Sequence, residues 1–234
     1  MKIGIFGTGM VAQTVGGALI ARGHDVQFGT RDVTGTLART EKTGLGSAPF
    51  SAWIKGNPKA TLVPFKEAAR HGEVLINATA GGGSLAALAS ADPMDLAGKI
   101  LIDIANPLDF SKGFPPTLSV CNTDSLAEQI QRAFPALKVV KSLNTVNASV
   151  MVTPAAVPGD HTIFVSGNDA AAKAAVQRYL GEWFGWQRSN ILDLGDITTA
   201  RGTEMFLALW IRLYASTKNP MVTIRVLQPP PAGH

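Results

Sequence analysis

The sequence predicts an α/β fold: a doubly wound parallel sheet followed by a small mixed α/β C-terminal portion. Short apolar runs alternate with helical segments along most of the 234 residues. Because most of these runs are apolar throughout and do not alternate with polar residues, helices are expected to cover both faces of the sheet. A glycine-rich turn joins the first strand to the first helix, which is typical of a Rossmann-type sheet.

The predicted elements follow in order along the chain. Strands are expected at 2–6, 25–28, 61–64, 74–78, 100–104 and 138–143, and helices at 10–22, 37–40, 50–54, 65–71, 85–88 and 126–134. The strand at 61–64 belongs at a sheet edge, because Pro64 cannot donate to a central ladder. The second part is expected to hold strands at 161–165 and 191–194, and helices at 170–184 and 198–215. We therefore predict a dinucleotide-binding domain over residues 1–150 and a smaller C-terminal portion over 151–234, with a disordered tail from 228.

Composition limits the classes of protein to consider. Hydrophobic residues make up 46% of the chain and charged residues 16%, which is typical of a globular protein. No apolar run is long enough for a membrane-spanning helix, and Cys121 is a single cysteine, which excludes an internal disulfide. The net charge of +4 comes from scattered basic residues, so we expect an anionic small molecule as ligand and neither nucleic acid nor membrane. The expected location is cytoplasmic.

The turn after the first strand has the spacing of a dinucleotide-binding fingerprint. Gly7, Gly9 and Ala12 fit the pattern G-x-G-x-x-G/A, after a strand and at the start of a helix. Gly7 permits the tight turn, and Gly9 lets a diphosphate approach the backbone. The helix starts at Met10 and Val11, and the free N–H groups of its first turn are expected to bind the diphosphate.

The end of the second strand predicts which nicotinamide cofactor is used. An NAD-binding fold usually places an acid there, but this chain has Thr30 and Arg31 before the first acid, Asp32. A hydroxyl and a guanidinium suit the 2′-phosphate of NADP(H). The alternative is that Arg31 is a solvated loop charge and that Asp32 binds the ribose of NAD.

At this point the sequence resembles the coenzyme F-420-dependent NADP oxidoreductases, which transfer hydride between a deazaflavin and NADP. The matching segments are Lys2-Ile3-Gly4-Ile5-Phe6-Gly7-Thr8-Gly9, Gly29-Thr30-Arg31-Asp32, Leu75-Ile76-Asn77-Ala78-Thr79, Ile102-Asp103-Ile104-Ala105-Asn106-Pro107 and Lys141-Ser142-Leu143-Asn144-Thr145.

The resemblance implies roles for single positions. Thr8 and Gly9 would contact the diphosphate, and Thr30 and Arg31 the 2′-phosphate. Family members often carry a lysine shortly after the Thr/Ser-Arg pair; this chain does not, so Arg39 would have to help. The loops at Thr79-Ala80 and Asn106-Pro107 would border the nicotinamide.

The carboxyl ends of the later strands are where a ligand would bind in such a sheet. Thr79, Asn106 and Asn144 lie at these ends, and the asparagines offer amide donors and acceptors. Each asparagine could instead bond its own backbone in a turn. We assign no catalytic residue, because hydride transfer between cofactors depends on positioning more than on acid–base groups. No residue spacing predicts a metal site.

The expected activity is hydride transfer between NADP(H) and a deazaflavin- or flavin-like acceptor. Two alternatives stay open: an NADP(H)-dependent reductase of an imine or keto acid on the same scaffold, and a redox sensor that binds NADP(H) without turnover.

Two features of the helix expected at 198–215 lead to further predictions. Tyr214 and Lys218 match the Tyr-x-x-x-Lys of short-chain dehydrogenases, but the position at the C-terminal end of a helix indicates a coincidence. The helix is apolar around most of its circumference, so it must be covered on most sides. We therefore predict a homodimer with this helix in or near the interface; burial against the chain's own sheet is the alternative.

Overall fold

The computed structural model describes residues 1–42 and 48–228. Its strands are β1 (Lys2–Phe6), β2 (Asp25–Thr30), β3 (Thr61–Pro64), β4 (Val74–Asn77), β5 (Ile100–Asp103), β6 (Leu108–Asp109), β7 (Thr117–Leu118), β8 (Lys138–Ser142), β9 (Ile163–Gly167) and β10 (Ile191–Gly195). Its α-helices are α1 (Met10–Ala21), α2 (Val33–Ala38), α3 (Phe50–Trp53), α4 (Phe65–His71), α5 (Ser84–Ala89), α6 (Pro93–Leu96), α7 (Leu126–Ala133), α8 (Ala148–Val152), α9 (Ala170–Phe184) and α10 (Ala200–Thr217).

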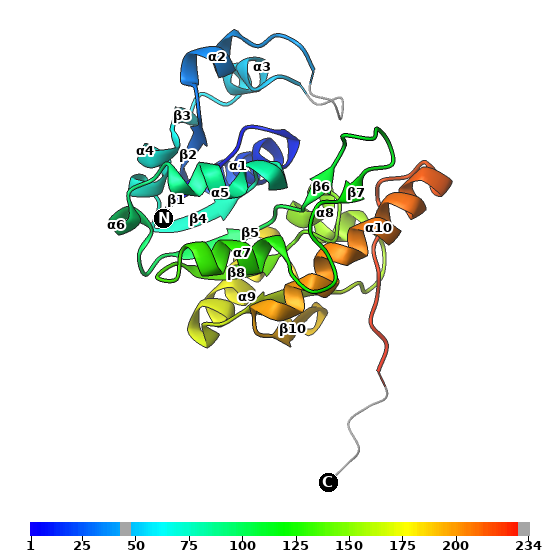
Figure 1. Ribbon diagram of the computed structural model, residues 1–234. Coiled ribbons are helices and arrows are strands. Elements are labelled where there is room, and N and C mark those ends of the chain that lie inside the picture. The colour runs from blue at the N-terminus through cyan, green and yellow to red at the C-terminus, as the bar shows by residue number, and fades with distance from the viewer. Residues whose placement is uncertain (43–47, 229–234) are drawn as a thin grey trace.

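Within these described residues, one sheet runs in the order β10-β9-β8-β5-β4-β1-β2-β3, with helices on its faces (Figure 1). Six neighbouring strands of this sheet, β8, β5, β4, β1, β2 and β3, pair in parallel, in the strand order of a Rossmann fold. The predicted α/β class and parallel sheet are confirmed, and β3 lies at the sheet edge as expected.

The C-terminal portion adds two strands to the same sheet beside β8, and these strands run opposite to the parallel ones. β9 pairs antiparallel with β8, and β10 pairs parallel with β9. The turn that follows β9 therefore lies at the amino end of β8, where Lys138 forms a 3.1 Å ion pair with Asp169. The division near residue 150 stays a prediction.

Several boundaries differ from those expected, for local reasons. β2 continues to Thr30, two residues past the predicted end. α2 begins at Val33, earlier than expected, because the Asp32 carboxylate caps it by accepting the Gly35 N–H at 2.9 Å. α6 is a helix that was not predicted, although Asp92 is its N-cap and Pro93 lies in its first turn. The small hairpin of β6 and β7 was not predicted either.

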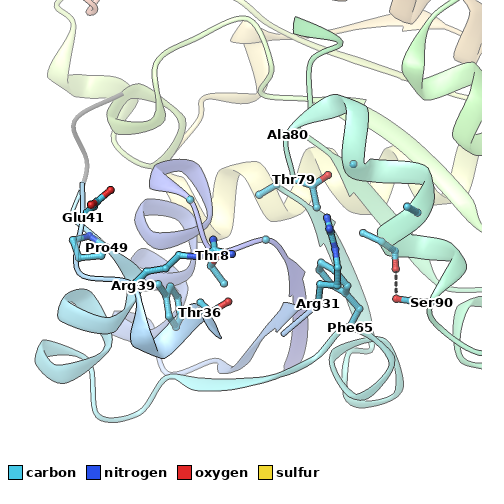
Figure 2. A pocket seen from close by; sticks show the side chains of 17 residues that line it. Thr8, Arg31, Thr36, Arg39, Glu41, Pro49, Phe65, Thr79, Ala80 and Ser90 are labelled. Atoms are coloured by element: carbon cyan, nitrogen blue, oxygen red, sulfur yellow. Dashed lines mark hydrogen bonds between the residues drawn. The ribbon is translucent and has the colours of Figure 1, made fainter. Parts of the chain in front are cut away.

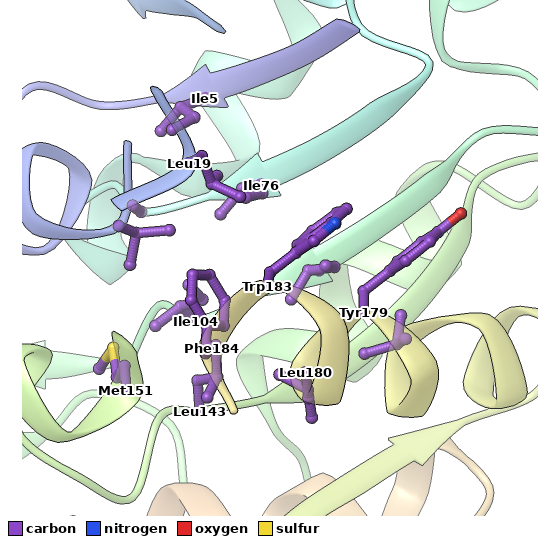
Figure 3. Packing of buried hydrophobic residues seen from close by; sticks show 14 of the residues in the cluster. Ile5, Leu19, Ile76, Ile104, Leu143, Met151, Tyr179, Leu180, Trp183 and Phe184 are labelled. Carbon is purple, nitrogen blue, oxygen red and sulfur yellow. The ribbon is translucent and has the colours of Figure 1, made fainter. Parts of the chain in front are cut away.

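Two apolar clusters cover the two faces of the sheet, as the continuously apolar strands required. One packs α1, α8 and α9 against β1, β2 and β4, and the other packs α4, α5 and α7 against the opposite face. Figure 3 shows the first cluster, where Trp183 and Tyr179 of α9 stack with ring centroids 4.3 Å apart. Neighbouring strand residues such as Leu75 and Ile76 enter different clusters, because strand side chains alternate between faces.

The chain beyond α10 folds back beside the start of β9. The Thr162 N–H donates to the Ile224 carbonyl at 2.8 Å, and Trp210 Nε1 donates to the Val222 carbonyl at 3.1 Å. Of the tail predicted to be disordered, only Gln228 lies within the described residues. In the described part of the chain, no helix combines the length and the apolarity needed to cross a bilayer.

Candidate functional site

The turn between β1 and α1 leaves the start of the helix open. Gly7 has a φ of +119°, and a Cβ there would lie 2.6 Å from the Ala78 carbonyl oxygen, so only glycine fits. Gly9 is the N-cap of α1 and supplies no side chain to cap it. A Cβ on Gly9 would meet nothing within 4 Å. The free N–H groups of the first turn, beside this open space, fit a diphosphate.

A cavity of about 520 Å³ lies against this turn (Figure 2). It is lined by Gly7, Thr8, Gly9, Arg31, Thr36, Arg39, Glu41, Pro49, Phe50, Phe65, Ala78, Thr79, Ala80, Gly83, Ala86, Ala87 and Ser90. In Figure 2, Arg31 extends toward Thr79, and Arg39 reaches toward Thr8. Two guanidinium groups therefore share one cavity with the glycine turn.

The residues at the end of β2 divide between the cavity and the interior. Arg31 is exposed and lines the cavity, whereas Thr30 is 8% exposed and is not among its lining residues. The Thr30 hydroxyl lies 2.8 Å from that of Thr36, within hydrogen-bond distance, and Thr36 does line the cavity. Sequence reasoning missed Thr36, which lies one helical turn past the Asp32 cap. Asp32 does not line the cavity, because its carboxylate caps α2.

Two further cavities continue along the carboxyl ends of the strands. One of about 190 Å³ is lined by Val11, Ala78, Thr79, Ala80, Gly81, Ile104, Ala105, Asn106, Leu108 and Phe110. The next, of about 130 Å³, is lined by Met10, Val11, Ile104, Asn106, Asn144, Val146, Asn147, Ala148, Met151, Leu207 and Trp210. Because neighbouring cavities share Thr79 and Ala80, or Val11 and Asn106, the three adjoin one another in a row from Arg31 to α10, and we call this row of cavities the groove.

The two asparagines predicted at the site bond to each other across strands. Asn144 Nδ2 donates to Asn106 Oδ1 at 2.9 Å and to the Thr203 carbonyl at 3.0 Å. Asn106 Nδ2 donates to the Asn144 carbonyl at 3.1 Å. Neither side chain closes a turn on its own backbone. Among the described residues, Asn144 Oδ1 has no donor, so this atom remains to accept from a ligand in the groove.

A buried charged cluster beneath the groove escaped sequence reasoning. Lys141 Nζ lies 2.9 Å from Asp103 Oδ2 and 2.8 Å from Glu204 Oε1, and all three side chains are buried. The Glu204 carboxylate also accepts N–H groups of Leu126 and Ala127 at the start of α7, whose dipole offsets the second negative charge. Although burial lowers the pKa of Lys141, Asp103 and Glu204 raise it more, so the ammonium is charged. The sequence does carry a signal for this cluster, because Asp103 and Lys141 are ionisable residues within two otherwise apolar strands.

Tyr214 and Lys218, which match the short-chain dehydrogenase pattern, do not line the groove. Tyr214 is 37% exposed, stacks on Trp210 and lines none of the three cavities. Lys218 is the left-handed C-cap of α10. In the described residues, no three His, Cys, Asp or Glu side chains gather closely enough to hold a metal ion.

Replacing Tyr214 by phenylalanine is therefore expected to leave hydride transfer within a few-fold of wild type. A general acid in that position would cost about 100-fold or more when removed. The measurement is the steady-state rate of NADPH oxidation, with circular dichroism to show that the variant folds. A loss of that size in a folded variant would contradict the prediction.

Comparisons with known proteins agree with this geometry. The family model described as "NADP oxidoreductase coenzyme F420-dependent" matches residues 2–107. A crystal structure assigned as an F-420-dependent NADP reductase of Arthrobacter sp. FB24 is 53% identical, with a TM-score of 0.91 over 97% of this chain and 100% of that one. A reductive aminase from Aspergillus terreus in complex with NADPH and ethyl levulinate has a TM-score of 0.61 at 17% identity, over 93% of this chain and 62% of its own. That likeness shows the fold alone.

The metalloreductase STEAP3 of Rattus norvegicus is 28% identical over 222 residues. The match covers 94% of this chain and 38% of the relative, so the chain spans well under half of that protein's length.

Proposed function

Since this chain belongs to the family of coenzyme F-420-dependent NADP oxidoreductases, we propose that it transfers hydride between NADP(H) and a deazaflavin- or flavin-like acceptor. The observation that carries the proposal is the row of three adjoining cavities along the carboxyl edge of the sheet. One end of this groove holds the glycine turn and two arginines, and the other end is mostly apolar. A groove of this kind suits an anionic dinucleotide lying beside a flat ring system.

The NADP(H) phosphates would lie at the Arg31 end. The N–H groups at the start of α1 would bind the diphosphate, which the open space at Gly9 admits. Arg31 and Arg39 would pair with the 2′-phosphate, and Thr36 would border it, because Thr36 lines the cavity and Thr30 does not. Asp32 does not line the cavity, and one of its carboxylate oxygens caps α2, which supports the 2′-phosphate assignment over an NAD ribose bound by Asp32.

The nicotinamide would lie at the second cavity. Val11, Ala80 and Ile104 offer apolar contact to the ring. Asn106 offers its amide group at the edge of this cavity, and Asn144, which lines the next cavity, donates to Asn106 Oδ1 at 2.9 Å. When bound, the nicotinamide supplies or accepts the hydride, so the protein's part is to fix the distance and to exclude water. This division of roles agrees with the lack of an assigned acid–base pair.

The third cavity supports a ring-shaped acceptor. Its wall includes Met151, Leu207 and the indole of Trp210. The carboxylate of a small keto acid would need a cationic partner, and the described residues that line this cavity include no lysine or arginine, whereas an isoalloxazine-like ring gains from apolar and aromatic contact.

The test is turnover of NADPH by the purified protein with four acceptors in parallel: coenzyme F-420, FMN, a cyclic imine and a 2-keto acid. We expect NADPH oxidation with F-420 or FMN and little with the other two. Turnover of only the imine or the keto acid would establish the alternative reductase. Tight NADPH binding without turnover of any acceptor would favour the redox sensor.

We also propose that the protein is a homodimer through α10. Leu207 and Ile211 of this helix are buried against the chain itself, but Met205 and Leu209 are 40% and 54% exposed. Covering these side chains would remove apolar surface from water. Light scattering is expected to give twice the mass of the chain, and a clean monomer mass would contradict the proposal. The cytoplasmic location stays a prediction from the sequence.

A further inference from the structure

A row of polar side chains crosses the centre of the sheet beneath the groove. Asn77, Asp103 and Lys141 occupy the same register position on the neighbouring strands β4, β5 and β8. Asp103 Oδ1 accepts a 2.8 Å hydrogen bond from Asn77 Nδ2, and Asp103 Oδ2 pairs with Lys141. The three side chains therefore form one hydrogen-bonded row in an otherwise apolar layer.

At each end of this row, side chains form hydrogen bonds with a residue that lines the groove. Lys141 Nζ donates to the Ala105 carbonyl, and the Ala105 N–H donates to Asp103 Oδ1 at 3.3 Å. At the other end, Asn77 Oδ1 accepts from the Thr79 hydroxyl at 2.8 Å and from the Thr79 N–H at 3.3 Å. Ala105 and Thr79 line the same cavity of about 190 Å³, in which the nicotinamide would lie.

A contribution to stability does not by itself explain why this polar row is present in the sheet. A buried ion pair rarely stabilises a fold more than apolar side chains of the same size would. Charge-assisted hydrogen bonds do, however, fix their partners at defined distances. The row thus determines how far apart the turns after β4 and β5 are held.

We propose that Asp103 and Lys141 are positioning residues for the nicotinamide end of NADP(H). They act through Asn77 on the turn at Thr79, and directly on the turn at Ala105. This inference rests on the proposed function, because it takes the second cavity as the place of the nicotinamide. Since a displacement of about 1 Å can cost about 100-fold in rate, small shifts of these turns would matter.

The variant Asp103→Asn tests the proposal. It keeps the size of the side chain and leaves one ammonium and one carboxylate in the buried cluster. An amide has one oxygen, so it cannot accept from Lys141 on one side and from Asn77 and Ala105 on the other. We expect the dissociation constant of NADPH to rise about 5-fold or more, which corresponds to the loss of about one hydrogen bond. Adenosine 2′,5′-bisphosphate, which has the 2′-phosphate but no nicotinamide, should bind as in wild type.

Asp124→Asn is the matched control. It makes the same chemical change and breaks the bidentate pair with Arg132, because an amide can accept only one of the 2.9 and 2.8 Å hydrogen bonds, but it touches neither the row nor the groove. This control should lower the melting temperature and leave the affinities for both ligands unchanged. With an acceptor that wild type reduces, Asp103→Asn should also lower kcat by about 100-fold.

The ratio of the dissociation constants of NADPH and adenosine 2′,5′-bisphosphate tests this proposal separately from the proposed function. If wild type reduces no acceptor, the proposed function fails, but the two dissociation constants still test the positioning role. Equal weakening of NADPH and adenosine 2′,5′-bisphosphate by Asp103→Asn, or no change in either, would overturn the proposal. Should that variant not fold, Asn77→Ser interrupts the same row without touching a charge. It is judged by the same ratio.

Discussion

Replacing Arg31 by alanine is expected to weaken NADPH binding by about 10- to 150-fold, the range of one charge-assisted contact. Arg31 is exposed at the end of β2 and lines the largest of the three cavities, beside the glycine turn. A 2′-phosphate carries nearly two negative charges, and a guanidinium can pair with it through two hydrogen bonds. NADH has no 2′-phosphate, so its affinity should stay nearly constant.

The measurement is the dissociation constant of both cofactors for wild type and variant. The preference for NADPH should also shrink as salt rises, because an exposed charge pair is screened. Arg39 lines the same cavity, so Arg39→Ala should give a change in the same direction. The assignment is wrong if wild type binds NADH as tightly as NADPH, or if Arg31→Ala weakens both cofactors equally.

Replacing Gly9 by alanine is expected to weaken NADPH and NADH alike, by at least about 10-fold. In the protein alone, the added methyl group has open space and an extended backbone, so it meets no atom. In the complex, it would stand where the diphosphate approaches the first turn of α1, and would separate charged oxygens from their N–H donors. The free energy of unfolding should change by no more than about 1 kcal/mol, the usual scale for an N-cap.

Gly16→Ala serves as the opposite case. A Cβ at Gly16 would lie 2.2 Å from Cζ of the buried Phe28 ring, which packs between Phe50 and Trp53. Overpacking of this kind costs about 1–3 kcal/mol, more than the gain of about 0.5–1 kcal/mol from helix propensity. Thermal unfolding and cofactor titration should therefore separate the two variants. If Gly9→Ala lost stability and kept its affinity, the diphosphate would lie elsewhere.

The sequence predicted those features that short-range patterns determine. Apolar runs located the parallel strands, and the spacing of Gly7 and Gly9 located the open end of α1. Arg31 immediately follows a strand end and lines the cavity; its role toward the 2′-phosphate stays a prediction. Its neighbour Thr30 is the last residue of that strand and does not line the cavity, whereas Thr36 of α2 does. Strand length decides which of two adjacent residues faces inward, and β2 proved longer than its apolar run.

Features that depend on pairing between distant segments could not be predicted in this way. The row of Asn77, Asp103 and Lys141 exists only because β4, β5 and β8 lie side by side in one register. Each residue alone appears as an isolated polar position in an apolar run. The direction of β9 is another case, since an apolar run has the same composition in a parallel and in an antiparallel strand.

The reversal of direction between β8 and β9 has a consequence for protein engineering. The glycine turn and both arginines that line the groove precede residue 40, whereas the apolar wall at its far end includes Leu207 and Trp210 of α10. β9 and β10 run opposite to the parallel strands, so the turns that follow them lie at the other edge of the sheet from the groove. The chain returns to the groove through α10. On the proposed function, cofactor preference and acceptor preference would reside in segments that are far apart in sequence. A chimaera that exchanges the segment carrying α10 between relatives is then expected to change the acceptor preference and to leave the cofactor preference as it is.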